Sequence, residues 1–318
     1  MSGYLARRFI AALVLLWLVS SAVFLFVRLL PGDPALIILG ASDASQPTAE
    51  QVATVRGELG LDKPLPEQYV TYLGNLIRGQ LGESFVTGRP VILDLRVRLG
   101  RTLQIMLPAI FLASLVGIVL GTLAARARGR LLDPILGATG LVGYSVPVFV
   151  IGNVLVLIFA ISLGVLPPSG YVDLAEDPVR SLRYMTMPIV ALALGPLAVT
   201  MRMTRTMIVD ELALDYVRTA RAKGLRDRLV IYRHVLKNAM LPVVAVIGLQ
   251  VGAALSGSVI VEYVFNWPGM GRLLLQSVGA RDYPLIQGIV LLGSALFAFV
   301  NFVTDVAYFY FNPRLRAR

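Results

Sequence analysis

Long uncharged, apolar runs alternate with polar segments along the whole chain. An α-helix needs about 20 such residues to cross roughly 30 Å of hydrocarbon. Because hydrocarbon offers no water to the backbone, a crossing chain must satisfy its own N–H and C=O groups within helices. The pattern therefore predicts six transmembrane helices, over residues 9–27, 102–125, 134–163, 184–201, 238–261 and 283–304.

The first polar segment, residues 31–98, carries mixed charges and is too polar to span. Residues 31–34, Pro-Gly-Asp-Pro, indicate a turn after the first helix, and Thr48 with Gln51 is typical of a capping box. Pro66 fits the first residue of another helix. We expect a small helical cap outside the membrane, and a structural lid is favoured over a binding site. One apolar face is predicted at Tyr69, Tyr72, Leu73 and Leu76.

Another outer segment, residues 262–283, contains Pro268-Gly269, which predicts a turn in which the glycine takes a positive φ. A short helix is expected to follow and to return toward the membrane surface. Tyr263 and Trp267 are interpreted as aromatic residues of the membrane interface. The helix is predicted from Leu273, Leu274, Leu275 and Val278.

A dense basic, polar insert between two long apolar runs lies at residues 216–242. Apolar spacing from Ile208 predicts that the fourth helix continues through this insert to Gly224, which would end it as a C′ glycine. Asp227 is expected to be the N-cap of a second helix, and Pro242 to kink it on entering the membrane. Two helices joined at a tight glycine turn indicate a docking lever for another protein.

Composition supports a membrane protein and changes the meaning of the charge. Hydrophobic residues make up 57% of the 318 residues, charged residues 15%, and the mean hydropathy is +0.75. Soluble domains lie near 45–50% apolar and about 25% charged. The net charge of +10 therefore marks loops kept in the cytoplasm rather than a nucleic-acid surface. Both termini are predicted to be cytoplasmic, because the basic clusters are Arg7 and Arg8, Arg126 to Arg130, the 216–242 insert, and Arg314 to Arg318.

Several chemistries are disfavoured by the residues that the sequence lacks. It has no cysteine and one histidine, His234, so thiol catalysis and multi-histidine metal sites are excluded. No lysine stands in a phosphate-binding P-loop, and no ionisable residue lies in the middle of a predicted span. Glu262 and Asp305 lie near span ends, and Asp305 is expected to pair with an arginine. A membrane hydrolase and an ion-coupled transporter are the disfavoured alternatives, so energy for transport would come from another subunit.

A few mild polar side chains interrupt the predicted spans. They fit either helix-to-helix hydrogen bonds or the lining of a transport pathway, and the sequence does not choose between these. Small residues four apart, at 117 and 121 and at 248, 252 and 256, indicate close helix contacts within the bundle or with a second subunit. The candidate pathway residues are Tyr144, Asn153, Gln250, Ser256 and Ser258.

Motifs spread over nearly the whole chain resemble one family. The basic insert reads YVRTARAKGL at residues 216–225, with His234, Asn238 and Pro242 following. Other matching motifs are LLPGDP at 29–34, LGLD at 59–62, QY at 68–69, LGES at 81–84, WPGMGR at 267–272, RDYP at 281–284 and NPR at 312–314. Together they resemble the permease subunits of dipeptide, oligopeptide and nickel ABC importers. The family's general Glu-Ala-Ala is Arg218-Thr219-Ala220 here, and Gln80 replaces a frequently acidic position.

The resemblance implies an all-α integral membrane protein with the type I ABC-importer permease fold and a small extracytoplasmic helical cap. It further implies a second homologous permease, two cytoplasmic ATPases that bind ATP and Mg²⁺, and an extracytoplasmic substrate-binding protein. Peptides are the expected substrate, and nickel complexes the alternative. The expected membrane is a bacterial or archaeal cytoplasmic membrane. ATPase coupling is assigned to Thr219, Ala220, Arg221, Ala222, Lys223, Gly224, Leu225, Asp227 and Arg228.

Four segments are expected on this basis. Residues 1–30 form the first helix and its cytoplasmic start, and residues 31–98 form the extracytoplasmic cap. Residues 99–308 form a five-helix permease core that includes the coupling loop, residues 208–238. Residues 309–318 form a cytoplasmic tail. Cofactors and metals are not expected in this chain.

Overall fold

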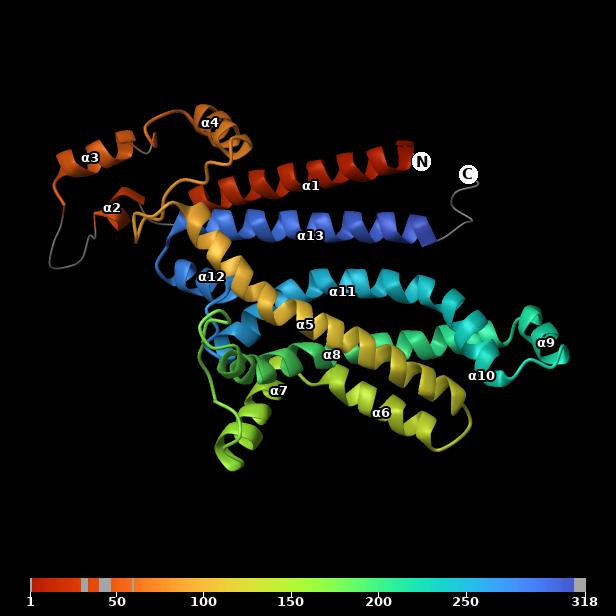
Figure 1. Ribbon diagram of the computed structural model, residues 1–318. Coiled ribbons are helices and arrows are strands. Elements are labelled where there is room, and N and C mark those ends of the chain that lie inside the picture. Colours follow the sequence, from red (N-terminus) through yellow and green to blue (C-terminus); the bar gives the residue numbers. More distant parts are fainter. Residues whose placement is uncertain (1, 30–33, 40–46, 59, 312–318) are drawn as a thin grey trace.

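The computed structural model describes residues 2–29, 34–39, 47–58 and 60–311 and shows a bundle of long helices lying side by side (Figure 1). Within these residues, five helices are long and apolar enough to cross a membrane, and the count is six if a bent pair of shorter helices is taken as one span. The first and last are α1 (Ser2–Leu29) and α13 (Tyr283–Phe311). Between them lie α5 (Val91–Arg126), α8 (Pro178–Leu212) and α11 (Leu236–Val264).

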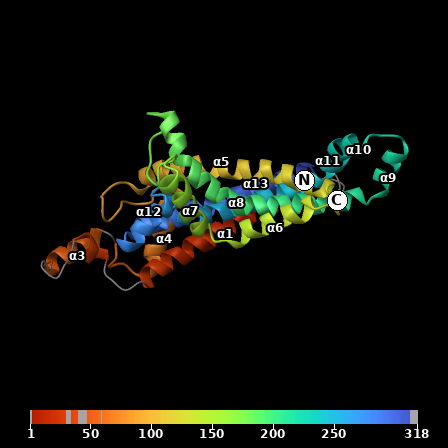
Figure 2. The same cartoon turned by 90° about the horizontal axis from the view of Figure 1, so that it is seen from below.

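Smaller helices gather at the two ends of the bundle, as Figures 1 and 2 both show. At one end, here called the cap end, lie α2 (Pro34–Ile38), α3 (Ala49–Glu58), α4 (Leu65–Ile77) and α12 (Met270–Gly279). The opposite end, here called the elbow end, carries α9 (Asp215–Ala222) and α10 (Asp227–Leu229). The start of α1 and the end of α13 also lie toward the elbow end. The arrangement agrees with an even number of crossings.

The third span differs from the prediction of one continuous helix over residues 134–163. It consists of α6 (Leu132–Ser145) and α7 (Val148–Leu155), the latter continued by the π-helical segment η1 (Val156–Ser162), and the two halves bend by 101°. The break lies at Val146 and Pro147, both of which have extended ψ values. Proline has no N–H to continue a helix and disfavours helical geometry in the residue before it. The bend could not be predicted from hydropathy, because residues 134–163 are apolar on both sides of it.

Glycines set the closest contacts between the long helices. A Cβ added at Gly117 would lie 2.8 Å from Thr200 Cβ, and one at Gly121 would lie 2.5 Å from Met201 O, so α5 and α8 touch backbone to backbone. Gly248 and Gly252 bring α11 equally close to Thr304 and Phe297 of α13. The four glycines among the small residues predicted to allow close contact therefore act within the bundle, whereas Ser256 is exposed.

The structure of the cap agrees closely with the predictions made from the sequence. Thr48 N donates to Gln51 Oε1 at 2.9 Å, and Gln51 N donates to Thr48 Oγ1 at 3.3 Å, which confirms the capping box at the start of α3. Pro66 is the second residue of α4 rather than the first. The predicted apolar face of α4 packs on α1, where Tyr69 lies 5.2 Å from the Phe24 ring. Of the turn predicted at 31–34, only Pro34 lies within the described residues.

The segment before α12 corrects two predictions. The positive φ belongs to Asn266 (54°), whereas Gly269 has a φ of −92°. Glycine at 269 instead leaves room for the Glu262 side chain, since a Cβ there would lie 2.3 Å from Glu262 Oε1. Trp267 is fully buried rather than interfacial, and its Nε1 donates to Arg101 O at 2.8 Å. Buried indole needs such a partner for its N–H. Tyr263, in contrast, is 68% exposed, as an interfacial aromatic would be.

Glu262 lies at the centre of this segment and is fully buried. Thr102 Oγ1 of α5 donates to Glu262 Oε1 at 2.6 Å, and Arg272 N of α12 donates to Glu262 Oε2 at 3.1 Å. Thr102 Oγ1 also accepts from Met270 N at 2.9 Å. We call this the Glu262 clasp; it joins α5, α11 and α12 at the cap end. Buried polar groups need such partners, and here each carboxylate oxygen has one.

One expected ion pair is present near the elbow end of the long helices. Arg8 Nε of α1 lies 3.2 Å from Asp305 Oδ2 of α13. The side chains are 51% and 26% exposed, so the pair contributes little to stability by itself. It nevertheless confirms that Asp305 pairs with an arginine.

The α5–α8 contact generates a stability prediction. Replacing Gly121 with alanine should lower the free energy of unfolding by about 1–3 kcal/mol, because the new methyl group overlaps the α8 backbone. Gly100 is a matched control on the same helix, since a Cβ there meets nothing within 4 Å. Thermal unfolding of the purified protein in detergent measures both. Equal melting temperatures for Gly121→Ala and Gly100→Ala would contradict the close contact.

Candidate functional site

The helix that leaves the bundle at the elbow end breaks before the glycine turn. The sequence predicted one helix from the fourth span to Gly224, but α8 ends at Leu212 and α9 begins at Asp215. Leu214 is extended, with ψ 151°, and separates them. Asp215 in the first turn and Arg221 in the last turn of α9 both complement a helix dipole, which favours a separate short helix here.

Gly224 ends α9 as predicted. Its φ is +79°, Gly224 N donates to Arg221 O at 2.9 Å, and Leu225 N donates to Ala220 O at 3.3 Å. These two bonds form a Schellman motif, which favours glycine because other residues rarely adopt this φ. The chain therefore reverses tightly between α9 and α10. We call α9, this turn and α10 the elbow, residues 215–229.

Asp227 does not have its predicted role. It is the first residue of α10, the N-cap position is Arg226, and no side chain caps this helix. The Asp227 carboxylate instead accepts from Arg221 Nε at 2.9 Å. The pair connects the two arms of the elbow across the turn. Because the side chains are 48% and 70% exposed, it orients the arms more than it stabilises them.

An apolar cluster holds the elbow against the bundle. Val217 of α9 is fully buried and packs with Ile208 of α8, itself fully buried. Val230 and Val235, equally buried, come from η2 (Val230–Val235), a π-helical segment between α10 and α11 that the sequence did not predict. Ala125 at the end of α5 completes the contact. A displacement of the elbow would therefore also displace the ends of α5, α8 and α11.

Polar contacts around the cluster were also missed by the sequence. Tyr216 OH donates to Glu211 at 2.5 Å and accepts from Asn238 Nδ2 at 3.4 Å, which links α8, α9 and α11. Burial and the Glu211 carboxylate raise the pKa of Tyr216, so its hydroxyl stays protonated and able to donate. Arg126 Nη1 donates to Tyr232 OH at 3.4 Å. Motifs gave no signal for these pairs, because the partners lie far apart along the chain.

The outer surface of the elbow is open. Residues 221–229 are all exposed, and Thr219 is exposed while Ala220 is half-buried. The structure thus brings together the nine residues assigned to coupling on one convex turn, with small or flexible side chains at its tip. Leu225 is 36% exposed and places an apolar group among charged neighbours. Such a shape fits a groove on another protein better than it fits a small ligand. The basic side chains on it are Arg218, Arg221, Lys223, Arg226 and Arg228.

The candidate pathway residues do not form one cluster. Tyr144 is 62% exposed, and Asn153 and Ser256 are also exposed. Gln250 Nε2 donates to Thr200 Oγ1 at 3.0 Å between α11 and α8, and Ser258 is buried and donates to Leu255 O at 2.8 Å. The last two therefore make contacts within the bundle. Across the described part of the chain, no group of three or more His, Cys, Asp or Glu could hold a metal ion.

The chain matches family models over most of its length. Residues 117–317 match the model described as "Binding-protein-dependent transport system inner membrane component". Residues 1–106 match the N-terminal model of the same kind of membrane component. The elbow lies within the first match, and the cap within the second.

Similar proteins match nearly the full chain. The di/tripeptide transport system permease protein DppB of Pseudomonas aeruginosa is 38% identical over 99% of each chain. The glutathione transport system permease protein GsiC of Escherichia coli is 41% identical, also over 99% of each. A probable peptide ABC transporter permease protein, y4tP of Sinorhizobium fredii, is 38% identical over 99% of this chain and 100% of its own. This chain therefore belongs to the family of inner-membrane components of binding-protein-dependent transport systems, and it is a multi-pass membrane protein.

Proposed function

We propose that this chain is the transmembrane permease subunit of an ATP-driven, binding-protein-dependent importer and forms half of its translocation pathway. The observation that carries the proposal is the elbow: an exposed Schellman turn in a family member, fixed by buried valines to the ends of three bundle helices. A solvated loop would need neither the turn nor the apolar contacts.

The other half of the pathway is a second homologous permease, and two cytoplasmic ATPases bind ATP and Mg²⁺. An extracytoplasmic binding protein delivers the substrate at the cap end. This chain itself is not an enzyme. The elbow end and both termini face the cytoplasm. The arginines of the short α5–α6 connection and of the elbow support this orientation, because cytoplasmic loops are enriched in basic residues.

Short peptides or peptide-like compounds are the proposed substrate. Support comes from the relatives, whose names specify di/tripeptides, glutathione and peptides. A nickel complex is the alternative within the same family. The binding protein selects the substrate, so the pathway of this chain needs only mild polar groups.

The proposed coupling step is mechanical. Each ATPase holds one elbow in a groove, and closure of the ATPases on ATP moves it. The residues in that groove are Thr219, Ala220, Arg221, Ala222, Lys223, Gly224, Leu225, Asp227 and Arg228. Because Val217 is packed against Ile208 and Val235, the movement reaches α8 and α11 and alternates access to the pathway. Of the five candidate pathway residues, Tyr144, Asn153 and Ser256 are exposed and fit a pathway lining, whereas Gln250 and Ser258 are bonded within the bundle.

An ion-coupled secondary transporter is the alternative of a different class. It would need a titratable group exposed to the transport pathway in mid-membrane. Glu262, the fully buried acidic residue of α11, has both oxygens bonded within the clasp at the cap end. The clasp therefore supports the ATP-driven proposal, since this carboxylate is occupied in holding helices together.

Replacing Gly224 with valine tests the elbow. Valine is strained at φ +79°, so the turn should open while membrane insertion is unaffected. We expect binding-protein-stimulated ATP hydrolysis by the assembled transporter to be abolished. Gly129 is a matched control, because its φ is +78° and a Cβ there also meets nothing within 4 Å, as at Gly224. Normal transport by Gly224→Val, or equal losses in both variants, would contradict coupling through the elbow.

Purification of the tagged chain from its native membrane tests the assembly. A permease subunit should bring down a second permease and ATPase subunits. Proteoliposomes holding the purified complex should take up labelled di- or tripeptides only when ATP and the binding protein are both supplied. Uptake by this chain alone, driven by an ion gradient, would overturn the proposal. Uptake of nickel complexes with no competition by peptides would overturn the substrate.

A further inference from the structure

The way α6 is held to the bundle is unusual. The structure describes every residue of α6, and Asp133 is its one buried residue. Most of the apolar side chains of α6 point away from the bundle, where Leu141 and Val142 are each 62% exposed. Apolar side chains that face lipid give no force toward neighbouring helices. A carboxylate, rather than an apolar core, therefore marks the attachment of α6.

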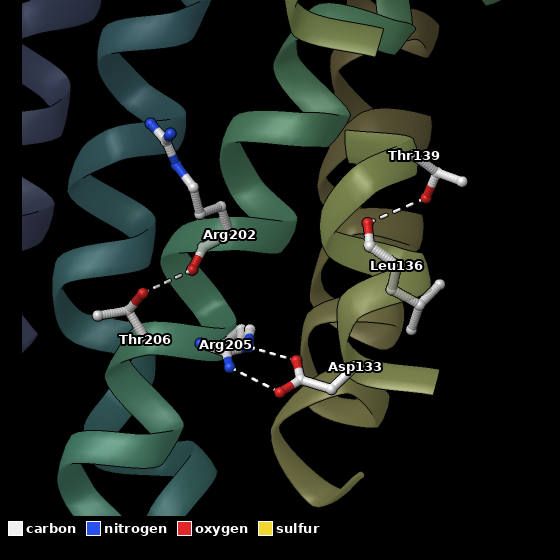
Figure 3. A network of polar contacts seen from close by, with 6 residues as sticks. All are labelled: Asp133, Leu136, Thr139, Arg202, Arg205 and Thr206. Atoms are coloured by element: carbon white, nitrogen blue, oxygen red, sulfur yellow. Dashed lines mark hydrogen bonds and ion pairs between the residues drawn. The ribbon is translucent and has the colours of Figure 1, made fainter. Parts of the chain in front are cut away.

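The partner of Asp133 is Arg205 of α8, shown in Figure 3. Arg205 Nε donates to Asp133 Oδ1 at 2.6 Å, and Arg205 Nη2 donates to Asp133 Oδ2 at 2.7 Å. Two parallel bonds fix the relative orientation of both groups, unlike a single contact. The Asp133 side chain is 11% exposed and that of Arg205 35%. A second contact lies further along α6, where a Cβ added at Gly140 would overlap the flexible end of the Met201 side chain.

Arg205 also lies close to the elbow along the chain. It lies seven positions before Leu212, where α8 ends, which is about 10 Å of continuous helix at 1.5 Å per residue. Ile208, between them, is part of the apolar cluster that holds Val217 of the elbow. A displacement of the elbow is therefore passed along a short rigid helix to Arg205.

On the other side of the ion pair, α6 leads to the bend of the third span. Val146 and Pro147 are extended there, and the proline has no N–H, so the angle between α6 and α7 can change without loss of a helical bond at that residue. The far arm, α7, is fixed differently. Its Gly152 lies close to Phe265, and its apolar residues pack on the main core. A force on α6 would thus change the bend rather than move α7.

We propose that the Asp133–Arg205 ion pair is the link through which the elbow moves α6 about Pro147. Asp133 and Arg205 are positioning residues: they contact no substrate and act through the bend, next to the candidate pathway residues Tyr144 and Asn153. The inference rests on the proposed function of the elbow. It adds that the bent third span is the element that opens and closes the pathway in this chain.

The test uses the complete transporter with its partner permease, ATPases and binding protein. Asp133→Asn and Arg205→Gln should leave binding-protein-stimulated ATP hydrolysis intact, because the elbow is unchanged. Substrate transported per ATP hydrolysed should fall about tenfold, the size expected for a residue that transmits coupling. The exchange Asp133→Arg with Arg205→Asp should restore most of the ratio. An unchanged ratio in the single variants, or an exchange that assembles and stays uncoupled, would overturn the link.

A matched control neutralises a different ion pair between two helices. Asp305→Asn removes an ion-pair partner of Arg8 between α1 and α13, two helices that carry neither α6 nor the elbow. The transport ratio should stay at the wild-type value. An equal fall in Asp305→Asn would show a general effect of lost charge and would overturn the specific role. If wild-type preparations lacked ATPase altogether, the proposed function would fail before any variant is compared.

A distance measurement remains decisive even if the single variants assemble poorly. The chain has no cysteine, so Thr139→Cys on α6 and Leu225→Cys on the elbow can be spin-labelled without other changes. In the assembled transporter with the ion pair intact, their separation should be equal in the nucleotide-free and ATP-bound states. In a second labelled pair, Thr139→Cys and Phe149→Cys on the two sides of the bend, the separation should differ between the nucleotide-free and ATP-bound states. The opposite pattern would overturn the proposal.

Discussion

The backbone contact between α5 and α8 is the interaction on which the rest of the bundle depends. Gly117 and Gly121 let the two longest single helices touch where any side chain would separate them. This contact fixes α8 along its length, and α8 then carries Arg205, Ile208 and the start of the elbow. In a membrane, where apolar side chains gain nothing by leaving lipid, such close packing supplies much of the force between helices.

The two ends of the bundle are held in different ways. At the cap end, the Glu262 clasp and the buried Trp267 join α5, α11 and α12 by directed hydrogen bonds. At the elbow end, a cluster of buried valines, the ion pair to α6 and the hydrogen bonds of Tyr216 hold otherwise exposed elements. Directed hydrogen bonds therefore act at both ends, and the elbow end adds an apolar cluster.

Much of the fold follows from the sequence because its causes are local. Hydropathy located the long helices, Thr48 and Gln51 gave the capping box, and Gly224 gave the end of α9. Features that depend on tertiary contacts were wrong or absent. Pro147 bends the third span inside an unbroken apolar run, and Gly269 is needed for the approach of Glu262 rather than for positive φ. Asp227 was assigned to its own helix, but its partner is Arg221 across the turn. The role of Asp133 depends on Arg205, 72 residues away.

The most direct test of coupling is contact between the elbow and an ATPase. A photo-crosslinking residue at position 225, in the assembled transporter in its native membrane, should form an adduct with an ATPase subunit. Thr71, exposed on α4 at the cap end, serves as the control position and should give no such adduct. No ATPase adduct from position 225 in a complex that contains the ATPases, or an ATPase adduct from position 71, would contradict the account.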